Sequence, residues 1–147
     1  MSISMLVFLN SCVQRTIDVI PYPNNVEYRS GAYAMSGEES VYAVNVDTVS
    51  LKHIEFFADS IGAKLITLGK PSREGFVFVH DSSLSEEAYV IDITKKCVKV
   101  EASGLRGFAY AVQTLLQMGT DIPCCRIEDS PRFSYRGLHL DEARHFF

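Results

Sequence analysis

The residues best equipped for chemistry lie close together near the C-terminal end of the chain. Arg136, His139, Asp141, Arg144 and His145 all fall within one short stretch. A guanidinium group offers fixed, planar donors that suit two neighbouring oxygen atoms. Imidazole and carboxylate groups are common metal ligands. This stretch is therefore the first place to look for a binding or catalytic function.

The histidines in and around this stretch could serve as metal ligands, but their spacing does not favour a metal site. His139, Asp141 and His145 offer imidazole and carboxylate groups close together, and His53 and His80 lie further upstream. The chain has no His-Glu-x-x-His and no Cys-x-x-Cys or Cys/His spacing of a zinc site. It also lacks the Gly-x-Ser-x-Gly sequence of serine hydrolases. We expect neither a metal ion nor a cofactor.

Composition and charge restrict the class of protein and its partners. The 147 residues suffice for one domain with its own hydrophobic core, and the net charge of −4 comes with scattered lysines and arginines. Nucleic acid is not an expected partner, because binding it requires a concentrated basic surface. The longest apolar stretch, residues 5–9, is far shorter than the roughly 20 residues of a transmembrane helix.

The N-terminal residues need a separate interpretation. The apolar stretch leads into Asn10, Ser11 and Cys12, which resembles the end of a bacterial lipoprotein signal, where the cysteine is lipidated. No lysine or arginine precedes the stretch, and it is shorter than the usual apolar region of about 7–15 residues. We interpret residues 1–17 as a signal or tether and Cys12 as the lipidation site of an exported, periplasmic or outer-membrane-anchored protein. The alternative is an ordinary N-terminus with an incidental cysteine.

The three remaining cysteines do not indicate a disulfide framework. Their number is odd, and the adjacent Cys124 and Cys125 cannot easily bridge to each other. We expect Cys97 in a strand and the adjacent pair in a loop.

Hydrophobic periodicity predicts two helices. A stripe of apolar residues at three- and four-residue steps predicts a helix over residues 49–61, ended by Gly62. A stronger stripe over residues 105–116 predicts a second helix, capped by Ser103 and ended by Gly119.

Short apolar and alternating runs predict the strands. Residues 89–93 and 97–101 form a hairpin in which alternate side chains face the core. The other predicted strands cover residues 26–28 and 33–35, around a turn at residues 30–31, then residues 41–46 and 76–80. Two helices and at least five strands, without strict βαβ alternation, indicate an α+β fold. We expect a mostly antiparallel sheet with two helices on one face.

The character of the chain changes after Thr120. Residues 121–131 are polar and rich in turn-forming residues, and residues 133–140 begin a new apolar element. We interpret this element as the start of a second domain. The expected organisation is an α+β domain over residues 18–130 and the first element of another domain over residues 131–147.

A long motif at this boundary resembles a known family. Residues 129–141, with Arg-His-Phe-Phe at 144–147, resemble the start of the catalytic barrel in glycoside hydrolase family 20, the β-N-acetylhexosaminidases. The family pattern is Pro-Arg-Phe, an aromatic residue or histidine, Arg-Gly, apolar residues, an aspartate, and Arg-His-Phe after two further residues. Three upstream segments also match: residues 20–23 resemble its Pro-x-Pro opening, residues 87–100 its hairpin, and residues 107–117 its Tyr-Gly-x-Gln-Thr-Leu helix, where Ala111 replaces the glycine.

The resemblance implies a fold and an activity. The family's small N-terminal α+β domain precedes a (β/α)8 barrel, of which this chain holds the first strand. Members remove terminal N-acetylglucosamine or N-acetylgalactosamine from glycans by substrate-assisted, retaining catalysis, in which the acetamido oxygen of the sugar attacks the anomeric carbon. An Asp-Glu pair on a later barrel strand orients the acetamide and acts as acid and base. Asp141-Glu142 does not occupy that place, so we expect this chain alone to be inactive.

The resemblance also assigns candidate site residues. Arg136 matches the arginine that holds the hydroxyl groups of the terminal sugar, and the alternative is that it forms a structural ion pair. Asp141, Arg144 and His145 lie at the end of the expected strand, where the functional residues of barrels gather. We expect them to shape the first loop of the site.

A different class of function is a free-standing carbohydrate-binding or interaction module. The motif at residues 129–147 argues against it, because an independent module has no use for a first barrel strand. Without the remaining barrel, we expect these apolar residues to make the chain self-associate or to dock on the α+β domain.

Overall fold

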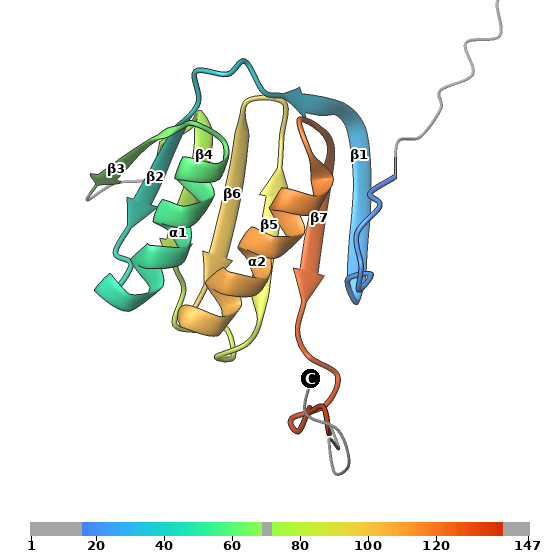
Figure 1. The fold of residues 1–147 in the computed structure, drawn as a ribbon. Coiled ribbons are helices and arrows are strands. Elements are labelled where there is room, and N and C mark those ends of the chain that lie inside the picture. Colours follow the sequence, from blue (N-terminus) through green and yellow to red (C-terminus); the bar gives the residue numbers. More distant parts are fainter. Residues whose placement is uncertain (1–15, 69–71, 140–147) are drawn as a thin grey trace, which may run out of the picture.

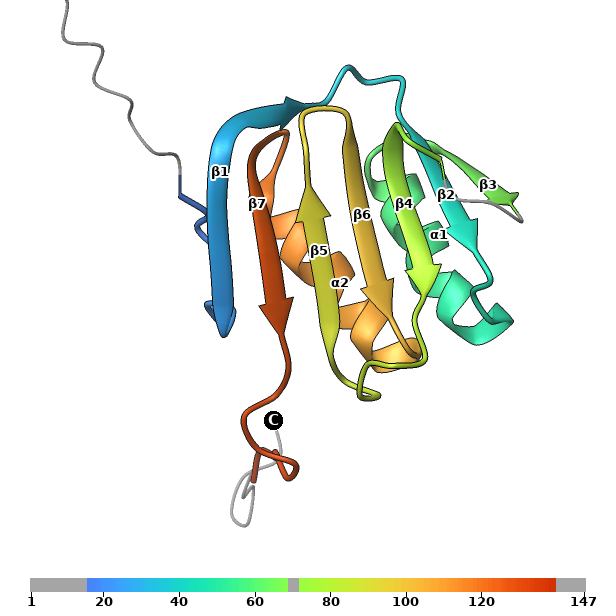
Figure 2. The same cartoon turned by 180° about the vertical axis from the view of Figure 1, so that it is seen from behind.

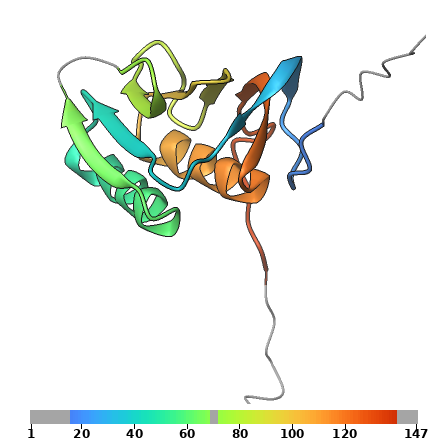
Figure 3. The same cartoon turned by 90° about the horizontal axis from the view of Figure 1, so that it is seen from above.

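The computed structural model describes residues 16–68 and 72–139, which form one seven-stranded sheet with two helices packed on one face (Figures 1 and 3). Among these residues the opposite face carries no helix (Figure 2). The elements in chain order are β1 (Asn25–Ala34), β2 (Ser40–Val44), α1 (Thr48–Ser60), β3 (Lys64–Leu68), β4 (Gly75–His80), β5 (Tyr89–Ile93), β6 (Cys97–Ala102), α2 (Leu105–Met118) and β7 (Asp121–Asp129). The α+β class is confirmed.

The sheet is mixed, which corrects the expected mostly antiparallel arrangement. In the strand order β1-β7-β5-β6-β4-β2-β3, the first four strands pair antiparallel, whereas β6, β4, β2 and β3 pair parallel. Helix α1 crosses the sheet between β2 and β3, and such a crossover makes the two strands parallel. The sequence pattern did not predict β3, a short strand at the sheet edge. The crossover from β2 to β3 was therefore not predicted either.

Strand β7 is the largest difference between the structure and the elements predicted from the sequence. The polar, turn-rich composition of residues 121–131 predicted no strand, but Asp121–Asp129 form a strand between β1 and β5. Cys124 and Cys125, expected in a loop, are buried within it, while Cys97 begins β6 as predicted. Pro123 lies opposite Ala32, at the irregularity of β1, where a proline is tolerated in a sheet.

Strand β1 is continuous, although two short strands around a turn were predicted. Its pairing with β7 shifts register between Tyr28 and Ala32, and Gly31 within this irregularity has a φ of 100°. The glycine that suggested a turn therefore serves a bulge-like distortion inside one strand.

The core lies between the sheet and the two helices. Phe57 of α1 packs edge-on against Phe76 and Phe78 of β4, with ring centroids 5.0 and 5.7 Å apart, and Phe108 of α2 extends the cluster. Each fully buried phenylalanine contributes about 1.5–3 kcal/mol through removal from water. The apolar stripes that predicted the helices are the faces buried here.

Both helices begin and end close to the predicted residues, but their caps differ. The carboxylate of Asp47 accepts hydrogen bonds from the backbone N–H groups of Val49 and Ser50 and caps α1. The predicted cap of α2 is wrong, because Gly104 takes the N-cap position without a side-chain bond. The hydroxyl of Ser103 instead donates to the carbonyl oxygen of Ser85, at 3.0 Å.

Candidate functional site

The segment that follows β7, residues 130–139, leaves the sheet at the C-terminal end of that strand without forming a helix or strand. We call it the exit segment. Phe133, Tyr135 and Leu138 are 67%, 89% and 93% exposed. The expected barrel strand over residues 133–140 therefore does not appear among residues 133–139, and Leu140 lies outside the described residues.

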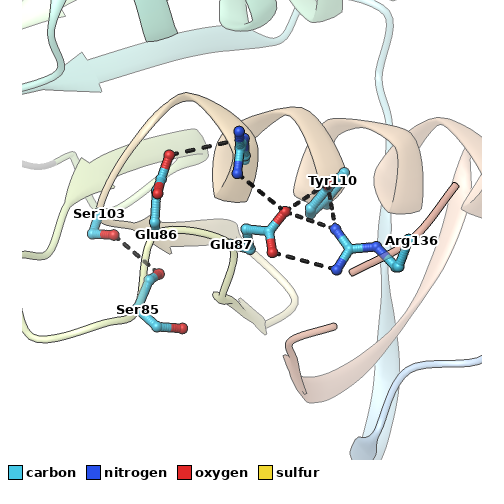
Figure 4. Close-up of polar contacts among 7 residues, drawn as sticks. Ser85, Glu86, Glu87, Ser103, Tyr110 and Arg136 are labelled. Atoms are coloured by element: carbon cyan, nitrogen blue, oxygen red, sulfur yellow. Dashed lines mark hydrogen bonds and ion pairs between the residues drawn. The ribbon is translucent and has the colours of Figure 1, made fainter. Parts of the chain in front are cut away.

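Arg136 of the exit segment is bound to the α+β domain (Figure 4). Its Nη2 donates to Oε1 of Glu87 at 2.7 Å and to the hydroxyl of Tyr110 at 3.2 Å. Its Nη1 lies 3.4 Å from Oε2 of Glu87 and donates to the carbonyl oxygen of Phe133 at 2.5 Å. We call Glu87, Tyr110 and Arg136 the Glu87 clamp.

The fold brings the two acceptors of the clamp together before Arg136 is added. Glu87 lies in the loop that precedes β5, and Tyr110 lies on α2. The backbone N–H of Gly107 donates to the carbonyl oxygen of Glu86 at 3.2 Å. A Cβ atom at Gly107 would lie only 2.5 Å from the carbonyl oxygen of Ala88, so only glycine permits this approach of helix and loop.

The electrostatics of the clamp favour the charged forms of both partners. Arg136 lowers the pKa of Glu87 most, the hydroxyl of Tyr110 and the charge of Arg106 lower it further, and partial desolvation opposes them. The pKa of Arg136 is raised, chiefly by its bond to Glu87. Arg106 lies 3.6 Å from Glu87 and also contacts Glu86 at 3.8 Å.

A pocket of about 470 Å³ lies beside the clamp. Its walls come from residues 20–24, α2 and the exit segment, and it includes the rings of Tyr22, Tyr110 and Phe133. The side-chain amide of Gln117 fixes one wall by bonding the backbone N–H and carbonyl of Ile20, at 2.9 and 3.1 Å. Aromatic rings beside amide and charged groups can receive a ligand that has both apolar and hydroxyl surfaces.

The floor of this pocket holds a buried polar contact. The hydroxyl of Tyr89 bonds Thr114 at 2.7 Å and Asp129 at 3.2 Å. Burial is the main cause of the raised pKa of Tyr89, and the carboxylate of Asp129 adds to it. Tyr89 therefore stays protonated and serves as a structural contact between β5, α2 and the end of β7.

The other predicted site residues are not brought together among the described residues. Asp141, Arg144, His145 and the predicted lipidation site Cys12 lie outside them. His139 is exposed at the end of the exit segment. Within residues 16–68 and 72–139, no three His, Cys, Asp or Glu side chains are grouped to hold a metal ion.

No helix in this part of the chain is long and apolar enough to cross a membrane.

Glu87 and Tyr110 were not predicted from the sequence as partners of Arg136. Both belong to segments noted for their resemblance to a hairpin and a helix, but the two residues lie 49 and 26 positions from Arg136. Local periodicity carries no signal for contacts at such separations. The sequence offered two roles for Arg136. In the structure it forms an ion pair with Glu87, and its contact with a sugar stays a prediction.

Comparison with known proteins identifies relatives of one kind. The chain is 32% identical to a β-hexosaminidase of Vibrio furnissii over 146 residues, which covers 89% of this chain and 22% of that protein. It is 37% identical to a β-N-acetylhexosaminidase of Cellulomonas fimi over 86 residues, 54% of this chain and 17% of the relative. The chain thus spans about a fifth of the length of these relatives.

Solved structures match the same region. A family 20 exo-β-N-acetylglucosaminidase from Vibrio harveyi, solved with N-acetylglucosamine, aligns with a TM-score of 0.66 and 31% identity over 88% of this chain and 21% of its own. A chitobiase of Flavobacterium johnsoniae aligns with a TM-score of 0.70 at 24% identity over 88% of this chain and 23% of its own, which supports the fold alone. The family description "Glycosyl hydrolase family 20, domain 2" matches residues 16–130. The chain belongs to glycosyl hydrolase family 20 and contains the N-terminal α+β domain of that family.

Proposed function

We propose that this chain is the N-terminal part of an exported β-N-acetylhexosaminidase that removes terminal N-acetylglucosamine or N-acetylgalactosamine from glycans. The observation that carries the proposal is the family match over residues 16–130. The 31% identity to an exo-β-N-acetylglucosaminidase over 88% of the chain adds support. Export and lipidation at Cys12 rest on the N-terminal sequence alone.

The proposed chemistry is substrate-assisted and retaining. The acetamido oxygen of the substrate forms a bond to the anomeric carbon while the glycosidic bond breaks, and the leaving oxygen takes a proton from a glutamic acid. The same glutamate then removes a proton from the water that completes hydrolysis. The proposal assigns the glutamate and its neighbouring aspartate to a later barrel strand, as the resemblance implies, and gives residues 16–139 the role of supporting the barrel.

Arg136 is proposed to hold the hydroxyl groups of the terminal sugar, with Asp141, Arg144 and His145 shaping the loop beside it. The planar guanidinium suits two neighbouring hydroxyls. In the structure this guanidinium bonds Glu87, Tyr110 and the carbonyl of Phe133. A guanidinium has five N–H donors, so we propose that Arg136 holds sugar hydroxyls while it keeps its ion pair with Glu87.

The test is hydrolysis of a chromogenic N-acetylglucosaminide by the intact protein. We expect turnover, and no turnover of the matched glucoside, because glucose lacks the acetamido group that attacks the anomeric carbon. Equal turnover of both substrates would contradict the substrate-assisted route, and turnover of neither would contradict the proposed activity. The polypeptide of residues 1–147 should hydrolyse neither.

The exposed apolar residues of the exit segment support the proposal that the isolated polypeptide self-associates. Phe133, Tyr135 and Leu138 face solvent. Deleting residues 132–147 should leave both helices and the sheet folded while lowering the associated fraction in analytical ultracentrifugation. Loss of the circular dichroism spectrum on deletion would show that the domain boundary near residue 130 is wrong.

A second candidate function is glycan binding by the α+β domain itself. The pocket of about 470 Å³, with the rings of Tyr22, Tyr110 and Phe133 in its wall, is the observation that favours it. The first proposal predicts that N-acetylglucosamine does not bind to residues 1–147 at millimolar concentration. Binding that is lost in Tyr22→Ala would support the second candidate.

A further inference from the structure

We propose that Glu87 and Tyr110 are positioning residues that hold the exit segment in one direction and so determine how the α+β domain presents the part of the chain that follows. The last step rests on the proposed function, in which a catalytic barrel follows. The Glu87 clamp would then allow the N-terminal domain to influence catalysis without touching the substrate.

The first observation is that the exit segment has few other attachments. Among the described residues, every hydrogen bond and ion pair between residues 131–139 and the rest of the domain involves Arg136. The first residue of the exit segment, Ser130, is held through its carbonyl oxygen by the side-chain amide of Asn24 at 2.6 Å. The polar attachment of the chain beyond Ser130 thus depends on one guanidinium group.

The second observation is that the acceptors are fixed independently of Arg136. The loop that carries Glu87 is closed by a bond from the backbone N–H of Ala88 to Ser85 at 3.0 Å and is joined to α2 through Gly107. Tyr110 lies on α2, one turn after this junction. The two acceptors of the clamp are therefore held in place by bonds within the domain, and the exit segment is attached to them through Arg136.

The third observation is that Arg136 also shapes the segment that it attaches. Nη1 donates to the carbonyl oxygen of Phe133, three residues earlier. Nη2 bonds Glu87 and Tyr110 (Figure 4). The planar group couples residues 133–136 to the domain surface. An ammonium group on a flexible stem would not fix both contacts in one plane.

Hydrogen exchange of the 147-residue chain, read by mass spectrometry, tests the clamp. Glu87→Gln keeps the shape of the side chain but removes its charge, and we expect exchange in residues 131–139 to become roughly threefold faster, as the loss of a partly exposed ion pair allows. Exchange in β5 and β6 should not change. Tyr110→Phe should give a smaller increase in the same residues.

The matched control is Glu86→Gln, the neighbouring glutamate, whose side chain contacts Arg106 at 3.8 Å and not Arg136. It should leave exchange in the exit segment as in the wild type. The pair is tested further by Arg136→Gln combined with Glu87→Gln, because two changes that break one contact should not add. An exit segment without protection in the wild type, equal effects of the two glutamate variants, or full additivity would each overturn the proposal.

The intact enzyme separates this proposal from the proposed function. If Glu87→Gln lowers kcat/KM for the chromogenic N-acetylglucosaminide about threefold and Glu86→Gln does not, the clamp positions the catalytic part. If the intact wild type hydrolyses nothing, the proposed function fails while the exchange result still decides the clamp. Unchanged kinetics in Glu87→Gln, together with faster exchange, would overturn the influence on catalysis.

Discussion

Two clusters of charged side chains in this domain contain ion pairs of similar length, but they attach different parts of the molecule. One is the Glu87 clamp. The other is a row on the helix-free face, which we call the Asp92 ladder: Asp92 lies 2.6 Å from Arg29 and 3.7 Å from Arg126, and Arg126 lies 2.8 Å from Glu128. The ladder joins β1, β7 and β5, strands that already share backbone hydrogen bonds.

The difference shows that a partly exposed ion pair affects the structure most where no other contacts hold the same segments. In the ladder, removal of a charge leaves three strands held by their backbone bonds and by the buried side chains of the other face. In the clamp, removal of Glu87 leaves the exit segment with only the bond of Arg136 to Tyr110 and that of Ser130 to Asn24 as polar attachments. Similar short contacts therefore have a redundant role in one region and a directing role in the other.

The largest expected effect comes from Arg136→Lys in the intact enzyme. If Arg136 holds sugar hydroxyls, we expect kcat/KM to fall on the order of 10²-fold. The reason is that the ammonium group of lysine cannot donate to two neighbouring hydroxyl oxygens in the planar geometry of a guanidinium. Arg126→Lys in the ladder is the matched control and should leave kcat/KM unchanged. A loss for Arg136→Lys no larger than that for Glu87→Gln would show that Arg136 only anchors the exit segment.

Breaking the preformed half of the clamp should have the next largest effect, on stability. Gly107→Ala places a Cβ atom 2.5 Å from the carbonyl oxygen of Ala88 and 2.9 Å from the Cβ of Ala102. We expect a loss of about 1–3 kcal/mol in the free energy of unfolding, measured by urea denaturation, because α2 must move away from the loop. Gly104→Ala, where the added Cβ meets open space, should cost less, at most about 1 kcal/mol, through the poorer N-cap that alanine makes for α2. Equal losses would mean that the close approach is not required.

The sequence predicted the two helices and the β5–β6 hairpin because each buries one face, and a periodic stripe records that burial. It failed at β7 for a physical reason. The charged Arg126 and Glu128 lie on the helix-free face, while Cys125 and Ile127 are buried. The mixture of charge, proline and cysteine resembled a loop, although it belongs to a strand paired on both sides.

The candidate site was predictable only in part. The motif around Arg136 identified the residue through a family resemblance, and the structure supplied its partners. Glu87 and Tyr110 could not be inferred, because their contact with Arg136 depends on how the loop before β5 and α2 come together in three dimensions. Long-range contacts of this kind follow from packing, which no local pattern in one sequence encodes.

Acid should release the exit segment before it unfolds the sheet. Arg136 lowers the pKa of Glu87 in the folded state. The ion pair is therefore fully formed above the ordinary glutamate pKa of about 4.3. It is lost as the pH falls through the lowered pKa of Glu87. Arg106 and Arg136 stay charged throughout this range. Exchange in residues 131–139, corrected for intrinsic rates, should therefore rise below about pH 4. Glu87→Gln should abolish this dependence, and its persistence in the variant would assign the effect to another carboxylate.

The smallest effect is expected where the comparison predicts redundancy. Asp92→Asn removes the charge that pairs with Arg29 and Arg126, yet Arg126 keeps Glu128. We expect the free energy of unfolding to fall by at most about 1 kcal/mol, and by less in 0.5 M salt, because exposed pairs are weak and screened. Asp59→Asn on α1, a residue without an ion pair among the described residues, is the control for the change of charge. If Asp92→Asn lowered stability by more than 2 kcal/mol relative to that control, the ladder would be holding the antiparallel half of the sheet together, and its contrast with the clamp would fail. A small loss without any change in exit-segment exchange would instead assign the directing role to the Glu87 clamp alone.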